Sequence, residues 1–372
     1  MIRLLLCALF FTFCVKSVEC QTKSIPMEEE NWDVQGEKFN FEMKEGQKSL
    51  FLQRSSALAK NVKFENGIIE FDILFAESRK FVGFIWRVVD NNFEELYLRP
   101  HQSGNPDANQ YTPVFNGNSG WQLYHGEGHG QPFNYRFDEW MHVKIAFKDQ
   151  DAEFYIDDME TPLFRAYELK KDSEAGLLGF RANGPEGGAY FANFKYTVTD
   201  DITFTAPPVE KPELGAEVIS SWQISSMAFN AKDLEDIGNI GQLKKSVPKW
   251  TTLKAESTGT INISRIQARS REINTVFAKC IIQSESDQVK QLDFGYSDEV
   301  VVMCNDQLLY RGDNSFRSRD YRYLGTIGYF DSVYLPLKKG KNEITIAVRE
   351  GFGGWGLRAK LKDLEGVKIL YK

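Results

Sequence analysis

The sequence predicts an all-β protein built from two antiparallel β-sandwiches of the jelly-roll type in tandem. Short runs of apolar and polar residues alternate with a period of two, which is typical of half-buried strands. Gly, Asn and Asp turns separate these runs, and helical periodicity is almost absent. Aromatic residues make up 13% of the chain, and 28 of them are Phe. Such side chains fill the space between two packed sheets.

Length and charge limit the class of protein. The chain has 372 residues, of which 42% are hydrophobic and 26% are charged, so it is long enough for two domains with their own cores. The formal net charge is −7. Because phosphate binding requires a cationic surface, we expect no nucleic-acid partner.

Residues 1–20 have the pattern of a secretory signal peptide. An apolar run at 4–15 follows a basic residue, and Val18 and Cys20 stand three residues and one residue before the expected cleavage site, at Gln21. The apolar run is shorter than the roughly 20 residues that cross a bilayer, so no membrane span is expected. We therefore predict a secreted or periplasmic protein.

The first domain is expected over residues 21–200. About ten short strand-like runs lie between turn signals there, and this spacing indicates a sandwich or barrel. The expected strands cover residues 38–43, 49–52, 68–75, a hairpin within 81–101, 120–124, 140–148, 152–156, 176–181 and 190–197.

A proline-rich segment at 201–218 has no periodicity and is expected to form an extended linker. The second domain, at 219–372, again shows strand-like runs. A two-residue turn at Asn305-Asp306 joins two of them, and residues 231–241 are expected to form a short helix or a loop. The expected strands cover residues 219–224, 259–266, 275–283, 291–294, 300–304, 307–310, 330–335, 342–349 and 356–362.

The hairpin of the first domain carries the main candidate site. Leu96 and Leu98 share the core face of its second strand. The opposite face carries a row of polar side chains, namely Glu95, Tyr97, Arg99 and His101. The loop at 102–120 is long and rich in Asn, Gly and Pro, and we expect it to fold over this face. Arg99 should face solvent, so that its replacement costs little stability. The alternative is an ordinary solvated sheet face.

Two cysteines remain after the expected cleavage, and both lie in apolar, strand-like runs. Cys280 and Cys304 could form a disulfide in an exported protein. Buried free thiols that serve as small core residues are the alternative that we favour. No His is near either residue in the sequence, so we expect neither a metal site nor a thiol nucleophile.

Several stretches resemble known superfamilies. In the first domain they are GIIEFDI at 67–73, YLRPHQSGNPDANQYTPVFNG at 97–117, WMHVKIAF at 140–147, AEFYIDD at 152–158, GLLGFRA at 176–182 and YFANFKY at 190–196. Through them, the segment 66–199 resembles the concanavalin A-like lectin/glucanase superfamily, and more narrowly its laminin-G-like and keto-disaccharide-hydrolase-type modules. This resemblance implies a sandwich fold and says less about function.

The second domain carries a resemblance of its own. The stretches are DEVVVMCNDQLLYRG at 298–312, YLPLKKGKNEITIAVRE at 334–350 and GGWGLRAKL at 353–361. They are similar to a galactose-binding-like jelly roll of the kind that is appended to glycosidases.

The sequence leaves open whether the protein is an enzyme. Retaining glycosidases of the first superfamily use the strand motif Glu-x-Asp-x-x-Glu, whose two Glu act as nucleophile and acid/base. The nearest match contains Glu70 and Asp72, but Phe75 replaces the last Glu and cannot donate a proton. Glu95 with Glu127 is the remaining candidate pair, and His101 is a further weak catalytic candidate.

No cofactor and no metal site are expected. His125 and His129 with Glu127 could bind a metal, but the flanking glycines favour a mobile loop. A structural calcium ion is left open, although no motif supports one.

The expected function is carbohydrate binding on the polar face of the first sandwich. Sugar sites combine aromatic rings, which stack on apolar sugar faces, with planar polar side chains. The expected ligand-binding residues are Glu95, Tyr97, Arg99, His101, Asn109, Gln110, Tyr111, Trp121 and Tyr124. Two alternatives stay open: a glycoside hydrolase or lyase that acts on a polysaccharide or modified disaccharide at the same face, and a structural or adhesion protein without a sugar site.

Overall fold

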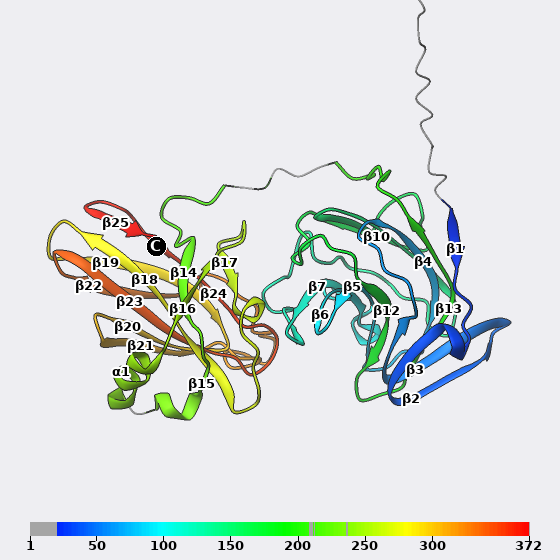
Figure 1. Cartoon of the computed structure of the whole chain (residues 1–372), viewed down its shortest axis with the longest axis horizontal. Helices are drawn as coiled ribbons and strands as arrows, with labels where there is room; N and C mark the ends of the chain where they lie inside the picture. The colour runs from blue at the N-terminus through cyan, green and yellow to red at the C-terminus, as the bar shows by residue number, and fades with distance from the viewer. Residues whose placement is uncertain (1–20, 208–210, 212, 236, 372) are drawn as a thin grey trace, which may run out of the picture.

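The computed structural model describes residues 21–207, 211, 213–235 and 237–371 (Figure 1). The expected signal peptide lies outside these ranges, as do residues 208–210 and 212 of the expected linker. Within them, neighbouring strands pair antiparallel and a single α-helix is present, α1 (Ile237–Ser246). The prediction of an all-β protein made of antiparallel sandwiches is confirmed.

Strands β1–β13 form one curled sheet, the N-terminal sandwich. Its strand order is β11-β10-β9-β4-β13-β3-β12-β5-β6-β7-β8, with β1 beside β13 and β2 beside β3. The elements are β1 (Thr22–Ser24), η1 (Glu29–Asn31), β2 (Trp32–Lys44), β3 (Gln47–Ala59), β4 (Gly67–Leu74), β5 (Phe81–Val89), β6 (Asn92–Leu98), η2 (Pro100–Gln102), β7 (Asn109–Phe115), β8 (Asn118–Ser119), β9 (Met141–Lys148), β10 (Asp151–Ile156), β11 (Phe164–Ala166), β12 (Leu177–Asn183) and β13 (Ala189–Val198). Figure 1 shows this sheet curled on itself, and its buried apolar residues form one core.

Phenylalanine fills the space between the layers of this sheet. Phe71 of β4, Phe84 of β5 and Phe180 of β12 lie with their ring centroids 5.1 to 5.7 Å apart. All three are at most 2% exposed. The high Phe content of the chain therefore serves the core, as the sequence predicted.

Strands β14–β25 form the C-terminal sandwich. One sheet has the order β16-β14-β18-β23-β20-β21 with β15 and β25 against β18, and the other has the order β17-β24-β19-β22. Buried residues of both sheets share one core. The elements are β14 (Ser221–Ser225), β15 (Phe229–Asn230), η3 (Ala231–Leu234), α1, β16 (Trp250–Lys254), β17 (Thr260–Asn262), η4 (Ile263–Arg265), β18 (Ile273–Ser284), β19 (Gln288–Ser297), β20 (Glu299–Cys304), β21 (Gln307–Asp313), β22 (Asp331–Leu337), β23 (Gly340–Arg349), β24 (Gly356–Leu361) and β25 (Val367–Leu370).

Local predictions for this sandwich are also confirmed. Asn305 and Asp306 both have positive φ, as a two-residue hairpin turn requires. Cys280 in β18 and Cys304 in β20 are buried and free, and burial raises the pKa of both thiols. They are small core residues, the alternative that the sequence favoured.

Residues 120–124, which were expected to form a strand, form a turn instead. The backbone N–H of Leu123 donates to the carbonyl of Gly120 at 2.8 Å. The backbone of Gln122 bonds with the C-terminal sandwich: its N–H donates to the Gly353 carbonyl at 2.8 Å, and its carbonyl accepts from Ile327 N–H at 2.9 Å. The alternating pattern misled because the partners of this backbone lie about 200 residues away in the sequence.

No helix among the described residues is long and apolar enough to cross a membrane.

Candidate functional site

The polar row of the β5–β6 hairpin lies on the expected face, but it is buried. Leu96 and Leu98 are core residues, at 2% and 3% exposed. Glu95, Tyr97 and Arg99, on the opposite side, are only 7%, 7% and 6% exposed. The expectation that Arg99 faces solvent is therefore wrong, because loops and the second sandwich come over this face.

Arg99 is the centre of a hydrogen-bonded network on that face. Its Nη1 donates to the backbone carbonyl of Asp107 at 2.7 Å, and its Nη2 donates to the Tyr97 hydroxyl and to Gln110 Oε1. The Tyr97 hydroxyl donates to the same Gln110 oxygen at 2.7 Å. Burial raises the pKa of Tyr97 far above its usual range, so the hydroxyl keeps its proton.

Gln110 connects this network to the turn at 120–124. Its Nε2 donates to the backbone carbonyl of Trp121 at 2.8 Å and to that of Tyr124. Since its Oε1 already accepts from Tyr97 and Arg99, both ends of the carboxamide are bonded. Gln110 therefore holds the turn rather than leaving a free group for a ligand.

Glu95 and His101 lie outside this network. The Glu95 carboxylate pairs with Arg181 of β12 at 3.3 Å. Burial raises the pKa of Glu95, and the positive charge of Arg181 opposes this rise. His101 packs edge-on against Phe81, with the ring centroids 5.3 Å apart. Burial lowers its pKa, and the charge of Arg79 adds to the effect.

Asn109 and Tyr111 occupy structural positions, which corrects their expected place on the polar face. Tyr111 is 0% exposed in the core, where its hydroxyl donates to Glu94 Oε2 at 2.8 Å. Asn109 Nδ2 donates to the backbone carbonyl of Gln131 at 2.7 Å, and Asn109 Oδ1 accepts from the Gln131 N–H. Period two explains both, because residues 109 and 111 share one side of β7 and Gln110 lies on the other.

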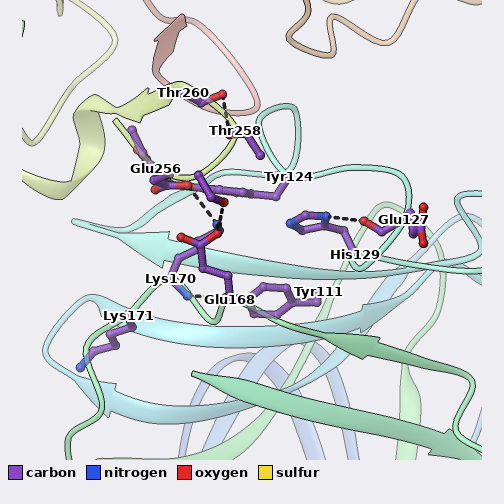
Figure 2. Close-up of polar contacts among 12 residues, drawn as sticks. Tyr111, Tyr124, Glu127, His129, Glu168, Lys170, Lys171, Glu256, Thr258 and Thr260 are labelled. Carbon is purple, nitrogen blue, oxygen red and sulfur yellow. Dashed lines mark hydrogen bonds and ion pairs between the residues drawn. The ribbon is translucent and has the colours of Figure 1, made fainter. Parts of the chain in front are cut away.

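Tyr124 is buried between the two sandwiches, among charged side chains (Figure 2). Its hydroxyl donates to Glu256 at 2.7 Å. Lys170 pairs with Glu256 at 3.2 Å and with Glu168 at 3.0 Å, and Arg265 pairs with Glu256 at 3.3 Å. The two cations and two carboxylates balance, as buried charges require. Because Tyr124 is only 3% exposed, it is no open platform for a sugar, contrary to expectation.

Gln122 reaches from the turn into a slot of the C-terminal sandwich. Its Nε2 donates to the Leu324 carbonyl at 2.7 Å, and its Oε1 accepts from the Ser297 hydroxyl at 3.0 Å. Gly325 and Gly353 line the slot, and a Cβ on either would lie 2.1 or 2.2 Å from the Gln122 carboxamide. The glycines are therefore needed for this approach. We call residues 120–124, with their partners in both sandwiches, the joint.

A small cleft of about 50 Å³ opens beside the joint. Four of the expected ligand-binding residues line it, together with His125, His129 and Asp107. The C-terminal sandwich contributes Leu324 and Thr326. The four expected residues are Arg99, Asn109, Gln110 and Trp121.

Three side chains of the cleft keep polar groups without a hydrogen bond to any described residue. They are the Asp107 carboxylate, the indole N–H of the half-buried Trp121 and Nε2 of His129. His129 Nδ1 donates to the Glu127 carbonyl at 3.1 Å, which leaves Nε2 as an acceptor. Burial, with the charge of Lys170, lowers the pKa of His129 to about 4, so the ring is neutral near pH 7.

The remaining candidates lie elsewhere. Glu127 is exposed and does not line the cleft, and no contact joins it to Glu95 among the described residues. Phe75 is a core residue at 1% exposed. Over the described part of the chain, no group of three or more His, Cys, Asp or Glu side chains is placed to hold a metal ion.

Sequence reasoning missed Asp107 and Gln122. Asp107 lies in the loop at 102–120 that was expected to be functional, but in GNPDAN it looks like an ordinary turn residue. Gln122 lies between apolar neighbours, and nothing local indicates that its partners are in the other sandwich. The glycine-rich run 351–356, which lines the slot, is the one signal in the sequence for a close approach of another segment.

Comparisons with known proteins show similarity at the level of solved structures. No family model matches the sequence, and no curated protein matches it significantly. The carbohydrate-binding module CBM66 from Bacillus subtilis is 15% identical over 44% of this chain and 94% of its own, with a TM-score of 0.33. A protein of unknown function with a galectin-like fold, also from Bacillus subtilis, is 12% identical over 48% and 98%, with a TM-score of 0.36. A Bacillus licheniformis β-glucanase is 11% identical over 48% and 98%, with a TM-score of 0.35.

The N-terminal sandwich is a curled antiparallel sheet, which agrees with the sandwich fold that the sequence resemblance implied, and the concanavalin A-like resemblance itself stays a prediction. The galactose-binding-like resemblance of the C-terminal sandwich stays a prediction. Identities of 11 to 15% transfer no residue role from these structures to this chain.

Proposed function

We propose that the protein binds carbohydrate at the cleft beside the joint. The observation that carries the proposal is the meeting of an unpaired carboxylate, Asp107, with the half-buried indole of Trp121 at one cleft. A carboxylate accepts hydrogen bonds from sugar hydroxyls, and an indole ring stacks on the apolar face of a sugar. The neutral imidazole of His129 adds an acceptor.

The size of the cleft defines how a sugar would bind. Its volume of about 50 Å³ is well below the roughly 300–1,000 Å³ of pockets that enclose a ligand. A hydroxyl or hydroxymethyl group would enter the cleft, and the sugar ring would lie across its mouth against Trp121. Binding of this kind suits one sugar unit within a longer glycan, because the rest of the glycan stays outside the cleft.

The cleft favours binding over turnover. Glycoside hydrolysis by two carboxyl groups needs a pair about 5–10 Å apart across the glycosidic bond. Among the described residues that line the cleft, Asp107 is the only carboxylate. Two similar solved structures bear the names of a carbohydrate-binding module and a β-glucanase. The proposal is of the same general class, and it rests on the geometry of this cleft.

The test compares cleft variants with matched controls. Trp121→Ala and Asp107→Asn should each weaken binding of a glycan found on an array by about tenfold or more, as measured by calorimetry. Tyr334→Ala removes an aromatic ring that is 66% exposed elsewhere, and Glu127→Gln neutralises an exposed acid next to the cleft. Both controls should stay within about twofold of the unmodified protein.

Three results would overturn the proposal. The first is unchanged binding in both cleft variants while their melting temperatures stay normal. The second is release of reducing ends from a polysaccharide panel, which would indicate a hydrolase or lyase. The third is a folded protein that binds no glycan on the array, which would leave the adhesion alternative.

A further inference from the structure

The C-terminal sandwich contains a much larger cavity, which we call the recess. Its volume is about 680 Å³, within the range of about 300–1,000 Å³ for ligand sites. Val301 of β20 and Ala347 of β23 lie in its floor, and both are buried. Residues at and beside η3 and before and at the start of β18 also line it, namely Asn230, Ala231, Lys232, Leu234, Glu235, Arg271, Glu272, Asn274 and Thr275. None of the cleft residues belongs to it.

A fixed side chain holds the wall of the recess in place. Arg311 Nη2 donates to the Leu234 carbonyl at the end of η3, at 2.8 Å, and to the Glu235 carbonyl at 3.4 Å. Arg311 belongs to β21, so η3 is tied directly to the sheet. These bonds hold the η3 side of the recess against β21.

The charges of the described residues that line the recess cancel. Four of these residues are basic and four are acidic. Glu299 and Arg349 form an ion pair whose side chains are 38% and 39% exposed. Glu299 Oε2 and Arg349 Nη2 have no hydrogen bond to any described residue. The pair thus offers one acceptor and one donor side by side.

We propose that the recess is a second binding site, for a neutral oligosaccharide. A hydroxyl group both donates and accepts, so it matches an adjacent carboxylate and guanidinium better than an anion or a cation does. The balanced charge gives no net attraction for a charged ligand. No aromatic ring is found among the described residues that line the recess, so hydrogen bonds rather than stacking determine which sugar binds. This site is independent of the cleft.

The experiment counts sugar molecules bound per chain. Neutral di- and trisaccharides are titrated by calorimetry into the full-length protein, the double variant Glu299→Ala/Arg349→Ala, and Trp121→Ala. The matched control is Asp287→Ala/Lys338→Ala, which removes an exposed ion pair of 3.0 Å outside the recess. Titrations followed by NMR on the amides of Thr275 and Gly312, which line the recess, show directly whether the sugar enters it.

We expect sugar binding that shifts the amides of Thr275 and Gly312. The double variant should bind about tenfold or more weakly, and the control should bind like the unmodified protein. If the double variant binds like the control and the two amides do not shift, the recess proposal is overturned and the cleft is unaffected. If Trp121→Ala changes nothing while the double variant loses binding, the cleft proposal falls and the recess stands. Amide shifts with a short mixed-charge peptide, but with no sugar, also overturn the recess proposal.

Discussion

The joint and the recess contain similar polar side chains, but these side chains differ in how many hydrogen bonds they form. In the joint, the carboxamides of Gln110 and Gln122 are bonded at both ends. In the recess, the Glu299–Arg349 pair keeps an unbonded donor and acceptor beside a cavity. Buried polar groups that are fully bonded hold a fold together, whereas unbonded ones at a cavity are free for a ligand. The number of hydrogen bonds that each polar side chain forms therefore distinguishes the joint from the recess, whereas the types of residue do not.

The largest expected effects come from Arg99, which bonds to Gln110 beside the joint, and from Leu98 in the core beneath it. Arg99→Ala should lower the free energy of unfolding by about 3 kcal/mol, because it leaves three buried acceptors on Tyr97, Asp107 and Gln110 without their charged donor. Leu98→Ala should cost roughly 2–5 kcal/mol through a core cavity. Urea unfolding measures both. A cost below about 0.5 kcal/mol for Arg99→Ala would mean that the row is a solvated face after all.

Gln122→Ala should have the next largest effect. It removes two side-chain hydrogen bonds between the sandwiches, at about 1 kcal/mol each. We expect a loss of about 2 kcal/mol and a larger radius of gyration in small-angle scattering as the sandwiches separate. Gln131→Ala, which removes an exposed side chain, is the control. An unchanged scattering curve and melting temperature would show that the joint does not depend on this carboxamide.

The joint should also weaken in acid through His129. Its pKa is lowered to about 4, mainly by burial, against about 6.5 in the unfolded chain. The unfolded chain therefore binds the proton first, so the stabilisation present above pH 6.5 is lost as the pH falls towards 4. Allowing for partial solvent access, we expect a loss of roughly 1–2 kcal/mol. His129→Phe, which keeps the stacked ring, should remove this acid dependence.

His142 provides a control for that pH profile, because its pKa is shifted in the opposite direction from that of His129. Its hydrogen bond with Asp72, at 2.6 Å, raises its pKa above the usual range. Its contribution is therefore complete below about pH 6.5 and is lost as the pH rises through the raised value. His142→Gln should change the neutral-to-alkaline side of the profile. Because its hydrogen bond also lowers the pKa of Asp72, the variant also changes the profile near and below the ordinary Asp pKa of about 3.9, but not the fall between pH 6.5 and 4 that belongs to His129. If His129→Phe leaves the acid side steep, the titrating group lies elsewhere.

The sequence correctly predicted which side chains share a face of a strand, but it did not predict that the polar face of the hairpin is buried. Leu96 and Leu98 are core residues as expected, because alternation with period two is a local property of the strand. The same rule, applied to β7, would have separated Gln110 from Tyr111. The local pattern could not predict that Arg99 is covered. The turn that covers it has backbone partners in the other sandwich, far away in the sequence.

The candidate sites, like the hairpin, could be predicted from the sequence only in part. The loop at 102–120 was expected to be functional, and it does supply Asp107 to the cleft. The recess could not be read from sequence, because its residues come from β18, β20, β21, β23 and η3, and only the fold brings them together. Its charged residues, taken one at a time along the chain, look like ordinary solvated strand ends.

The smallest expected effect belongs to the recess and completes the comparison. Glu299 and Arg349 form a half-exposed ion pair, and such pairs contribute about 0–1 kcal/mol because solvent screens the attraction and holding two long side chains costs entropy. The double variant Glu299→Ala/Arg349→Ala should therefore unfold within about 1 kcal/mol of the unmodified protein, while Arg99→Ala loses about three times as much. Urea unfolding of both variants under identical conditions makes the measurement, with Asp287→Ala/Lys338→Ala as the reference for an exposed pair. A loss above about 2 kcal/mol in the recess variant would place this pair with the structural network of the joint, and sugar binding could then not be separated from folding.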